Sequence, residues 1–132
     1  MQTTLLITDN QQDAVEALSA VRHHAALYIG GMGARRANFY NALAVRYGYA
    51  QAARAIQDLY LAGKKAEAAA AVPVELARRM SLIGPAEYVA ERLKVYADAG
   101  VTCLLVSPAA GHHKDRLQDM ATLKNELWPR ED

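Results

Sequence analysis

The sequence predicts an α/β fold in which two short parallel strands are joined by a long, mostly helical stretch. Two apolar runs mark the strands, at Thr3–Thr8 and Val101–Val106. The second run lacks polar alternation, which is typical of a strand buried on both faces of a parallel sheet. Helical periodicity covers most of the remaining chain, and strands separated by helices favour a parallel sheet.

The clearest unit is a helix followed by a strand, between Ser81 and Pro108. Gly84 and Pro85 suit the N-cap and first helical position, because proline has no N–H to leave unpaired there. The helix runs to Ala99 with an apolar stripe at Val89, Leu93 and Tyr96. Gly100 ends it in the usual left-handed position, and the strand follows. Cys103 lies within that strand, so we expect its side chain to be buried and to serve packing.

The other helices have recognisable limits. Asn10 and Asp13 resemble a capping box, and the helix that follows runs to about Ile29. Its predicted apolar face contains Val15, Leu18, Val21, Ala25 and Tyr28. Further helices are predicted over residues 37–47, 51–62, 64–72, 73–80 and 114–128, with a strand-like segment at Met80–Ile83. The predicted inner face of the last helix consists of Leu117, Met120, Ala121, Leu127 and Trp128.

Composition excludes several classes of protein. The chain has 132 residues, 52% of them hydrophobic and 22% charged, which suits one modest soluble domain. Its net charge of +1 gives no electrostatic reason to expect nucleic acid or a membrane surface as partner. A single cysteine excludes a disulfide framework and favours the cytoplasm. No apolar run reaches the roughly 20 residues of a membrane span, and no signal peptide is recognisable.

Two strands leave two unpaired sheet edges, and a chain of 132 residues is too short for a complete (β/α)8 barrel. We therefore expect a homo-oligomer, or another missing partner, that covers the region Val101–Val106.

A resemblance to a known family is carried by three segments: ALYIGGMGARRANFYNALAVRYGY, IQDLYLAGKKAEAAAAVP and SLIGPAEYVAERLKVYADAGVTCLLVSP. They are similar to the C-terminal part of luciferase-like monooxygenases, most of all the branch that uses the deazaflavin coenzyme F420. The resemblance extends from Thr3 to Trp128. It implies that residues 1–132 form a single partial domain, the C-terminal fragment of a TIM (β/α)8 barrel. Thr3–Thr8 and Val101–Val106 would be its seventh and eighth strands, with a helical insertion at about 13–80.

The resemblance also implies a function. The full-length family transfers a hydride between F420, or alternatively FMN, and a small-molecule substrate. The first six strands carry most of the family's deazaflavin site and its acid/base residues, so we assign no catalytic residue here. We expect the isolated chain to be inactive and to bind F420 weakly or not at all. The alternative is a non-catalytic remnant or interaction module that associates with itself.

Two basic segments are candidate substrate sites. Arg35 and Arg36 follow the glycines of Gly30–Gly33, a pattern that can cradle an anion. The alternative is a helix stop followed by a solvated turn. Arg79 matches the position of a basic residue that meets the substrate phosphate in related sugar-phosphate dehydrogenases. The alternative is an exposed arginine pair, with Arg78, at a helix end.

The end of the second strand is a candidate cofactor site. Ser107 and Gly111 lie where the resemblance places the barrel's C-terminal rim, although Ser, Pro and Gly also favour turns on their own. The end of the first strand would lie at the same rim, with Thr8, Asp9 and Asn10. Helix capping is enough to account for Asn10. The adjacent histidine pairs lack metal-ligand spacing, so we expect no metal site. Tyr28 and Tyr40 flank the glycine turn and are candidates to line a pocket.

Overall fold

The computed structural model describes residues 2–128 and divides the chain into two compact units. The first unit is built from residues 2–17 and 78–128, and the second from Leu18–Ala77. The first unit contains a small sheet with helices, whereas the second is helical. Each unit has its own apolar cluster, so each is described separately below.

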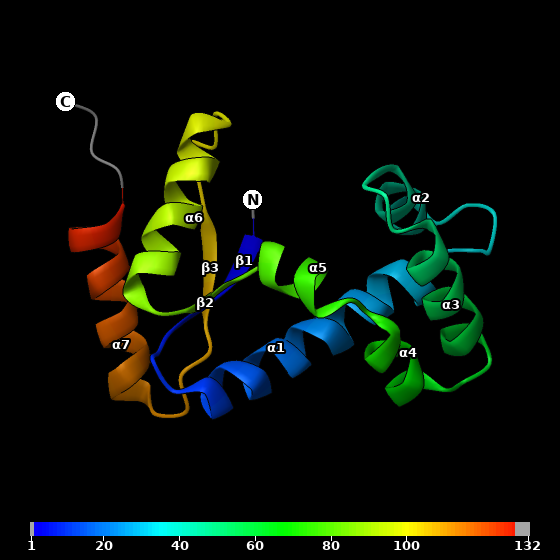
Figure 1. The fold of residues 1–132 in the computed structure, drawn as a ribbon, viewed down its shortest axis with the longest axis horizontal. Helices are drawn as coiled ribbons and strands as arrows, with labels where there is room; N and C mark the ends of the chain where they lie inside the picture. The colour runs from blue at the N-terminus through cyan, green and yellow to red at the C-terminus, as the bar shows by residue number, and fades with distance from the viewer. Residues whose placement is uncertain (1, 129–132) are drawn as a thin grey trace. The chain divides into compact units, whose positions relative to one another are not determined.

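The sheet of the first unit has three parallel strands (Figure 1). They are β1 (Gln2–Ile7), β2 (Leu82–Gly84) and β3 (Leu105–Pro108), in the order β2-β1-β3. Leu5 of β1 pairs with Leu82 of β2, and Gln2 pairs with Leu105 of β3. This confirms the α/β class with short parallel strands. The structure adds β2, which coincides with the strand-like segment that the sequence analysis did not count as a strand.

One face of this sheet is covered by helices of the same unit. α6 (Ala86–Asp98) lies alongside the strands, and α7 (His113–Thr122) continues into the π-helical turn η2 (Leu123–Leu127) (Figure 1). The buried cluster contains Leu5, Leu82, Val89, Leu93, Tyr96 and Leu123. The predicted apolar stripe of α6 at Val89, Leu93 and Tyr96 is confirmed.

The predicted strand Val101–Val106 is shifted and is not buried on both faces. β3 begins at Leu105, and the Leu105 side chain is 63% exposed. Cys103 is exposed as well, so its expected burial was wrong. The physical reason is that β3 is an edge strand: among residues 2–128 it pairs only with β1, and α6 and α7 cover a single face.

The second unit is a set of helices joined by short turns. It contains most of α1 (Gln11–Ala26), then η1 (Leu27–Gly31), α2 (Phe39–Arg46), α3 (Ala50–Leu61), α4 (Lys65–Ala71) and most of α5 (Val74–Arg79). Alanine is common in its core, which includes Ala25, Ala26, Ile29, Ala44, Ala53, Ile56, Ala68, Ala69, Val72 and Leu76. Small side chains allow the helix axes to approach closely.

When the π-helical turns η1 and η2 are counted with α1 and α7, the helix limits lie within about two residues of those predicted. Gly48, Gly63 and Gly100 have φ values of +94°, +81° and +84°, as expected of residues that end helices in the left-handed region. The start of α6 differs by one residue, because Pro85 is the N-cap and Gly84 is the last residue of β2. Within residues 2–128, no helix is both long and apolar enough to cross a membrane.

Two predicted apolar faces need correction. Val15 in α1 is 58% exposed, although Leu18, Val21 and Ala25 are buried as expected. In α7, Leu117 and Met120 are exposed, whereas Asp119 and, at the start of η2, Leu123 are buried. α7 carries apolar side chains on two stripes, and periodicity alone does not indicate which stripe faces the sheet.

Candidate functional site

The carboxyl edge of the sheet is where the candidate site is built. The strands are parallel, so the ends of β1, β2 and β3 meet at one edge. The Thr8 N–H donates to the Gly84 carbonyl at 2.9 Å, and the Ala109 N–H donates to the Leu5 carbonyl at 2.8 Å. In parallel α/β folds, ligands bind outside this edge of the sheet. These bonds hold the loops after β1 and β3 against the sheet.

The two predicted cofactor residues both lie at or near this edge. Ser107 pairs with Thr4, so its side chain points to the face opposite Leu5 and the covering helices. Gly111 lies three residues beyond the end of β3 and is exposed. A Cβ atom added at Gly111 would meet no atom within 4 Å. Ser107 and Gly111 therefore border open space, which the planar ring of the predicted cofactor would need.

Two residues of α7 belong to this edge although the sequence analysis did not identify them. Arg116 donates from Nε to the Ala110 carbonyl at 2.5 Å and from a terminal nitrogen to the Gly111 carbonyl at 3.5 Å. Asp119 accepts the Ile7 N–H at 3.2 Å through Oδ2. The sequence separation between Ile7 and Asp119 is 112 residues, so no local pattern could reveal this contact.

The pKa of the Asp119 side chain at this edge is perturbed. Burial raises the pKa of the Asp119 carboxyl, and only 8% of the residue is exposed. The Ile7 N–H opposes this by favouring the charged form, and the nearby Asp115 carboxylate raises the pKa further. The carboxylate is thus held where ionisation is costly, at the end of the central strand.

Thr8 and Asn10 have a structural role at the same edge. Asn10 Oδ1 accepts the N–H groups of Gln12 at 2.8 Å and Asp13 at 3.3 Å. Thr8 Oγ1 accepts the Asn10 N–H at 3.0 Å. These bonds confirm that Asn10 caps α1, because they satisfy N–H groups that a helix start leaves unpaired.

Arg79 lies at the opposite edge of the sheet. It ends α5, three residues before β2 begins, and Thr3 near the start of β1 donates to the Met80 carbonyl at 3.0 Å. Tyr96 and Arg92 donate to the Arg79 carbonyl at 3.2 and 3.1 Å. The structure therefore does not bring Arg79 together with Ser107 and Gly111, and its phosphate role stays a prediction.

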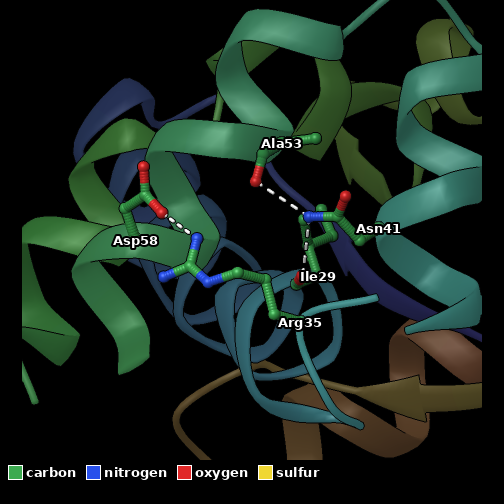
Figure 2. Close-up of polar contacts among 5 residues, drawn as sticks. All are labelled: Ile29, Arg35, Asn41, Ala53 and Asp58. Atoms are coloured by element: carbon green, nitrogen blue, oxygen red, sulfur yellow. Dashed lines mark hydrogen bonds and ion pairs between the residues drawn. The ribbon is translucent and has the colours of Figure 1, made fainter. Parts of the chain in front are cut away.

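Arg35 and Arg36 lie in the second unit, in the exposed turn between η1 and α2. Figure 2 shows that the Arg35 guanidinium points to Asp58 of α3, with which it forms an ion pair. An anion at this turn would have to share Arg35 with that carboxylate. Anion binding by Arg35 and Arg36 stays a prediction.

Gly30 and Gly31 have a packing role that neither interpretation of the sequence considered. A Cβ atom at either position would lie closer than 3.0 Å to the Tyr60 side chain. Both glycines are part of η1, so the π-helical turn packs directly on Tyr60 of α3. Gly33, with φ of +136°, is the glycine that the following turn requires.

Two asparagines fix this turn and were also missed. Asn38 Nδ2 donates to the carbonyls of Tyr28 at 3.0 Å and Ile29 at 3.1 Å, and its Oδ1 caps α2. Asn41 Nδ2 donates to the carbonyls of Ile29 at 3.1 Å and Ala53 at 2.9 Å (Figure 2). A helix end leaves its last carbonyls unpaired, and these amides satisfy those of Tyr28 and Ile29 in η1.

Aromatic rings gather near this turn. The rings of Tyr28 and Tyr40 meet edge to face with centroids 4.7 Å apart, and His24 and Phe39 extend the row at 4.7 and 5.4 Å. Tyr28 and Tyr40 therefore contact each other. Within the described part of the chain, no three His, Cys, Asp or Glu side chains gather in a way that could hold a metal ion.

Comparisons with known proteins point to one family. A family model described as "Luciferase-like monooxygenase" matches residues 1–103. A protein of Mycobacterium tuberculosis named "Putative coenzyme F420-dependent oxidoreductase" is 33% identical over 119 residues, which cover 90% of this chain and 33% of the relative. The chain thus spans about a third of the length of the curated relative that it matches. No solved structure matches the chain significantly.

Proposed function

Because this chain belongs to the luciferase-like monooxygenase family, we propose that it forms part of an oxidoreductase that uses the deazaflavin F420 for hydride transfer with a small-molecule substrate. The observation that carries the proposal is the similarity over 90% of the chain to a protein named for its use of F420. FMN is the alternative cofactor.

The carboxyl edge of the sheet supports a role in cofactor binding. Ser107 presents a hydroxyl on the uncovered face of the sheet, and Gly111 leaves space beside the loop that Arg116 holds. When bound, a deazaflavin supplies the hydride chemistry itself. In the proposal, Ser107 hydrogen-bonds to the cofactor, and Arg79, Arg35 and Arg36 are candidates for anionic groups of the substrate.

We propose that residues 1–132 act as one partial domain, the last two βα units of a luciferase-like barrel with a helical insertion at about 13–80. Hydride transfer requires reacting atoms that are held close and aligned, and barrel enzymes build that geometry from loops after many strands. The two proposed cofactor contacts are too few to offset the entropy of fixing a large anionic cofactor. We therefore expect the chain alone to turn nothing over.

A titration of F420 into the isolated chain, followed by the cofactor's fluorescence, tests this proposal. We expect no saturation in the micromolar range, and parallel titration with FMN serves as the comparison. Micromolar or tighter binding of F420 would show that the chain holds a complete site. Tight binding of FMN without F420 binding would replace the proposed cofactor.

A second candidate function is self-association as a non-catalytic module. The observation that favours it is the exposed aromatic surface of the second unit, where Phe39 and Tyr47 are 68% and 65% exposed. Monomeric proteins rarely leave large apolar patches uncovered. Sedimentation of the wild type and of Phe39→Ser distinguishes the candidates, because a homo-oligomer built on this surface should dissociate in the variant. We place either form in the cytoplasm on the basis of its single cysteine.

A further inference from the structure

The outer face of α2 in the second unit carries apolar side chains. Ala44 is buried and Asn41 donates to the Ala53 carbonyl, so these two residues mark the side of α2 that packs on the unit. Phe39, Ala42 and Arg46 fall on the opposite side, at positions i, i+3 and i+7 of a helical stripe, and all three are exposed. A helix that lies against solvent on this side normally presents polar residues there.

The residues next to this face are apolar as well. Met32 in the preceding turn, Tyr40 and Val45 in α2, and Tyr47 directly after it are between 39% and 65% exposed. We call the exposed side chains of residues 32–47 the α2 surface. It combines aromatic and aliphatic side chains, and all of it belongs to the second unit.

The α2 surface also carries positive charge and no negative charge of its own. Residues 32–47 include Arg35, Arg36 and Arg46 and contain neither Asp nor Glu. Asp58 of α3 forms an ion pair with Arg35, but among the described residues no carboxylate pairs with Arg36 or Arg46. The longer stretch 17–57 has no carboxylate either, although the whole chain has a net charge of only +1. The net charge of the chain therefore conceals a basic region.

The α2 surface has few groups for directional hydrogen bonds. Apart from tyrosine, its segment has two neutral polar side chains, Asn38 and Asn41. Both amides donate inward, to carbonyls of η1 and α3. Protein interfaces usually contain about one hydrogen bond per 100–200 Å2, which requires polar groups spread over the surface. Apolar side chains with arginines instead suit a partner that is anionic and apolar and that needs no directional recognition.

We propose that the α2 surface binds the headgroup region of a bilayer that contains anionic lipids. Met32, Phe39 and Val45 enter the boundary between headgroups and acyl chains, and Arg36 and Arg46 meet the anionic headgroups. Tyrosine suits this position, because its ring is apolar and its hydroxyl stays in contact with water. The proposal goes beyond the proposed function, because it involves neither F420 nor a substrate.

Two other partners fit the α2 surface less well. Single-stranded nucleic acid stacks its bases on aromatic rings, which leaves the aliphatic Met32 and Val45 without a role. Two copies of the chain related by a two-fold axis would present the same surface to each other. Arg36 and Arg46 would then face a surface that has arginines and no carboxylate within residues 32–47.

Cosedimentation of the full chain with lipid vesicles tests the proposal. Vesicles of about three parts phosphatidylcholine to one part phosphatidylserine should bind the chain at least about tenfold more tightly than vesicles of phosphatidylcholine alone. Raising NaCl from about 0.1 M to about 0.5 M should weaken this binding by a similar factor, because salt screens exposed charges. Failure to bind the mixed vesicles, or equal binding to both kinds of vesicle, would overturn the proposal.

Two charge reversals provide a matched pair of variants. Arg36→Glu and Lys94→Glu change the net charge equally and replace exposed residues, but Lys94 lies on α6 in the first unit. We expect Arg36→Glu to weaken binding to the mixed vesicles at least about tenfold and Lys94→Glu to leave it nearly unchanged. Phe39→Ser should weaken it as well, because it removes a ring from the boundary. Circular dichroism checks that the variants fold, and equal binding by both charge variants would contradict contact through residues 32–47.

Two further measurements test the other partners of the α2 surface. Binding of single-stranded oligo(dT) more tightly than mixed vesicles, with loss of that binding in Arg36→Glu and Phe39→Ser, would assign the surface to nucleic acid and overturn the proposal. Self-association in sedimentation velocity without lipid, abolished by Phe39→Ser, would assign it to a second copy and overturn the proposal too.

Discussion

At the scale of single residues, Asp119 shows how a side chain completes a sheet. The last residue pair between β1 and β3 is Leu5 with Pro108. The Ile7 N–H lies beyond this pair and has no partner in β3. Asp119 accepts it from α7. A buried donor left without a partner costs about 1–3 kcal/mol, which is the free energy that the carboxylate saves.

Asp119 should make stability depend on pH. Its pKa is raised in the folded state above the ordinary value of 3.8, mainly by burial. The folded chain therefore binds this proton more tightly than the unfolded chain, so the contribution is fully present below 3.8 and is lost as pH rises through the raised pKa. Asp119→Asn keeps an acceptor but no charge. Relative to this variant, the wild type should lose free energy of unfolding as the pH of urea titrations rises from about 4 toward neutrality.

The control for this prediction is Asp119→Leu, which removes the acceptor. It should be less stable than Asp119→Asn throughout that range, by about 1–3 kcal/mol, because the Ile7 N–H then has no partner. Parallel pH profiles for the wild type and Asp119→Asn would show that the carboxyl does not titrate differently in the folded chain.

Figure 2 shows polar contacts of Asn41 and of Arg35, which should differ in their effect on stability. Asn41 bridges the carbonyls of Ile29 and Ala53, two half-buried bonds between three elements. Arg35 and Asp58 form an exposed ion pair, with side chains 56% and 52% accessible. Asn41→Ala should cost about 1–3 kcal/mol, and Arg35→Ala less than about 1 kcal/mol. Thermal unfolding of both variants measures the difference, and a larger loss for Arg35→Ala would contradict this ranking.

At the scale of elements, local signals predicted the helices well. Capping residues and glycines define helix ends through backbone geometry, which a sequence displays directly, as at Asn10 and Gly100. The strand β2 was not counted because three residues are too few to show a periodicity. The limits of β3 were misplaced because burial on both faces was inferred from composition, and burial depends on neighbours outside the run.

α7 and the turn η2 that continues it allow a test of which of their two apolar stripes supports the fold. Leu123 is 7% exposed in the cluster with Leu5 and Leu93, whereas Leu117 is 59% exposed. Leu123→Ala should destabilise the chain by about 2–5 kcal/mol through lost burial and a cavity. Leu117→Ala should change the free energy of unfolding by less than about 0.5 kcal/mol. Chemical denaturation gives both values, and equal losses would mean that the second stripe is also covered in solution.

At the scale of the whole molecule, the two apolar clusters predict two units of stability. Leu93 belongs to the cluster of the first unit and Ile56 to that of the second, and both are fully buried. Leu93→Ala should therefore accelerate amide exchange in α6 and β1 and leave α3 protected, and Ile56→Ala should do the reverse. Native-state hydrogen exchange resolves the two regions. Loss of protection in both regions with either variant would show a single cooperative unit.

The family could be inferred from the sequence, whereas the composition of the candidate site could not. The resemblance and the comparisons agree on luciferase-like monooxygenases, and the predicted Ser107 and Gly111 do lie at the carboxyl edge. Arg79 lies at the other edge because α5 leads into the start of β2. The direction of β2 relative to its neighbours is set by strand pairing in the sheet, which the sequence alone does not display. Arg116 and Asp119 reach the edge through contacts that only folding creates.

The contact of η1 with Tyr60 also limits how this region can change during evolution. A Cβ atom added at Gly31 would lie 2.4 Å from the Tyr60 ring, whereas one added at Gly30 would lie 2.5 Å from the Tyr60 Cβ atom. A side chain at position 31 therefore requires the Tyr60 ring to move or to become smaller, and a side chain at position 30 requires the Tyr60 backbone to shift. In a library that randomises positions 31 and 60, an alanine at position 31 should survive selection mainly in clones that have lost the ring at position 60. The contact with Tyr60 on the neighbouring helix is thus the reason that both positions are glycine.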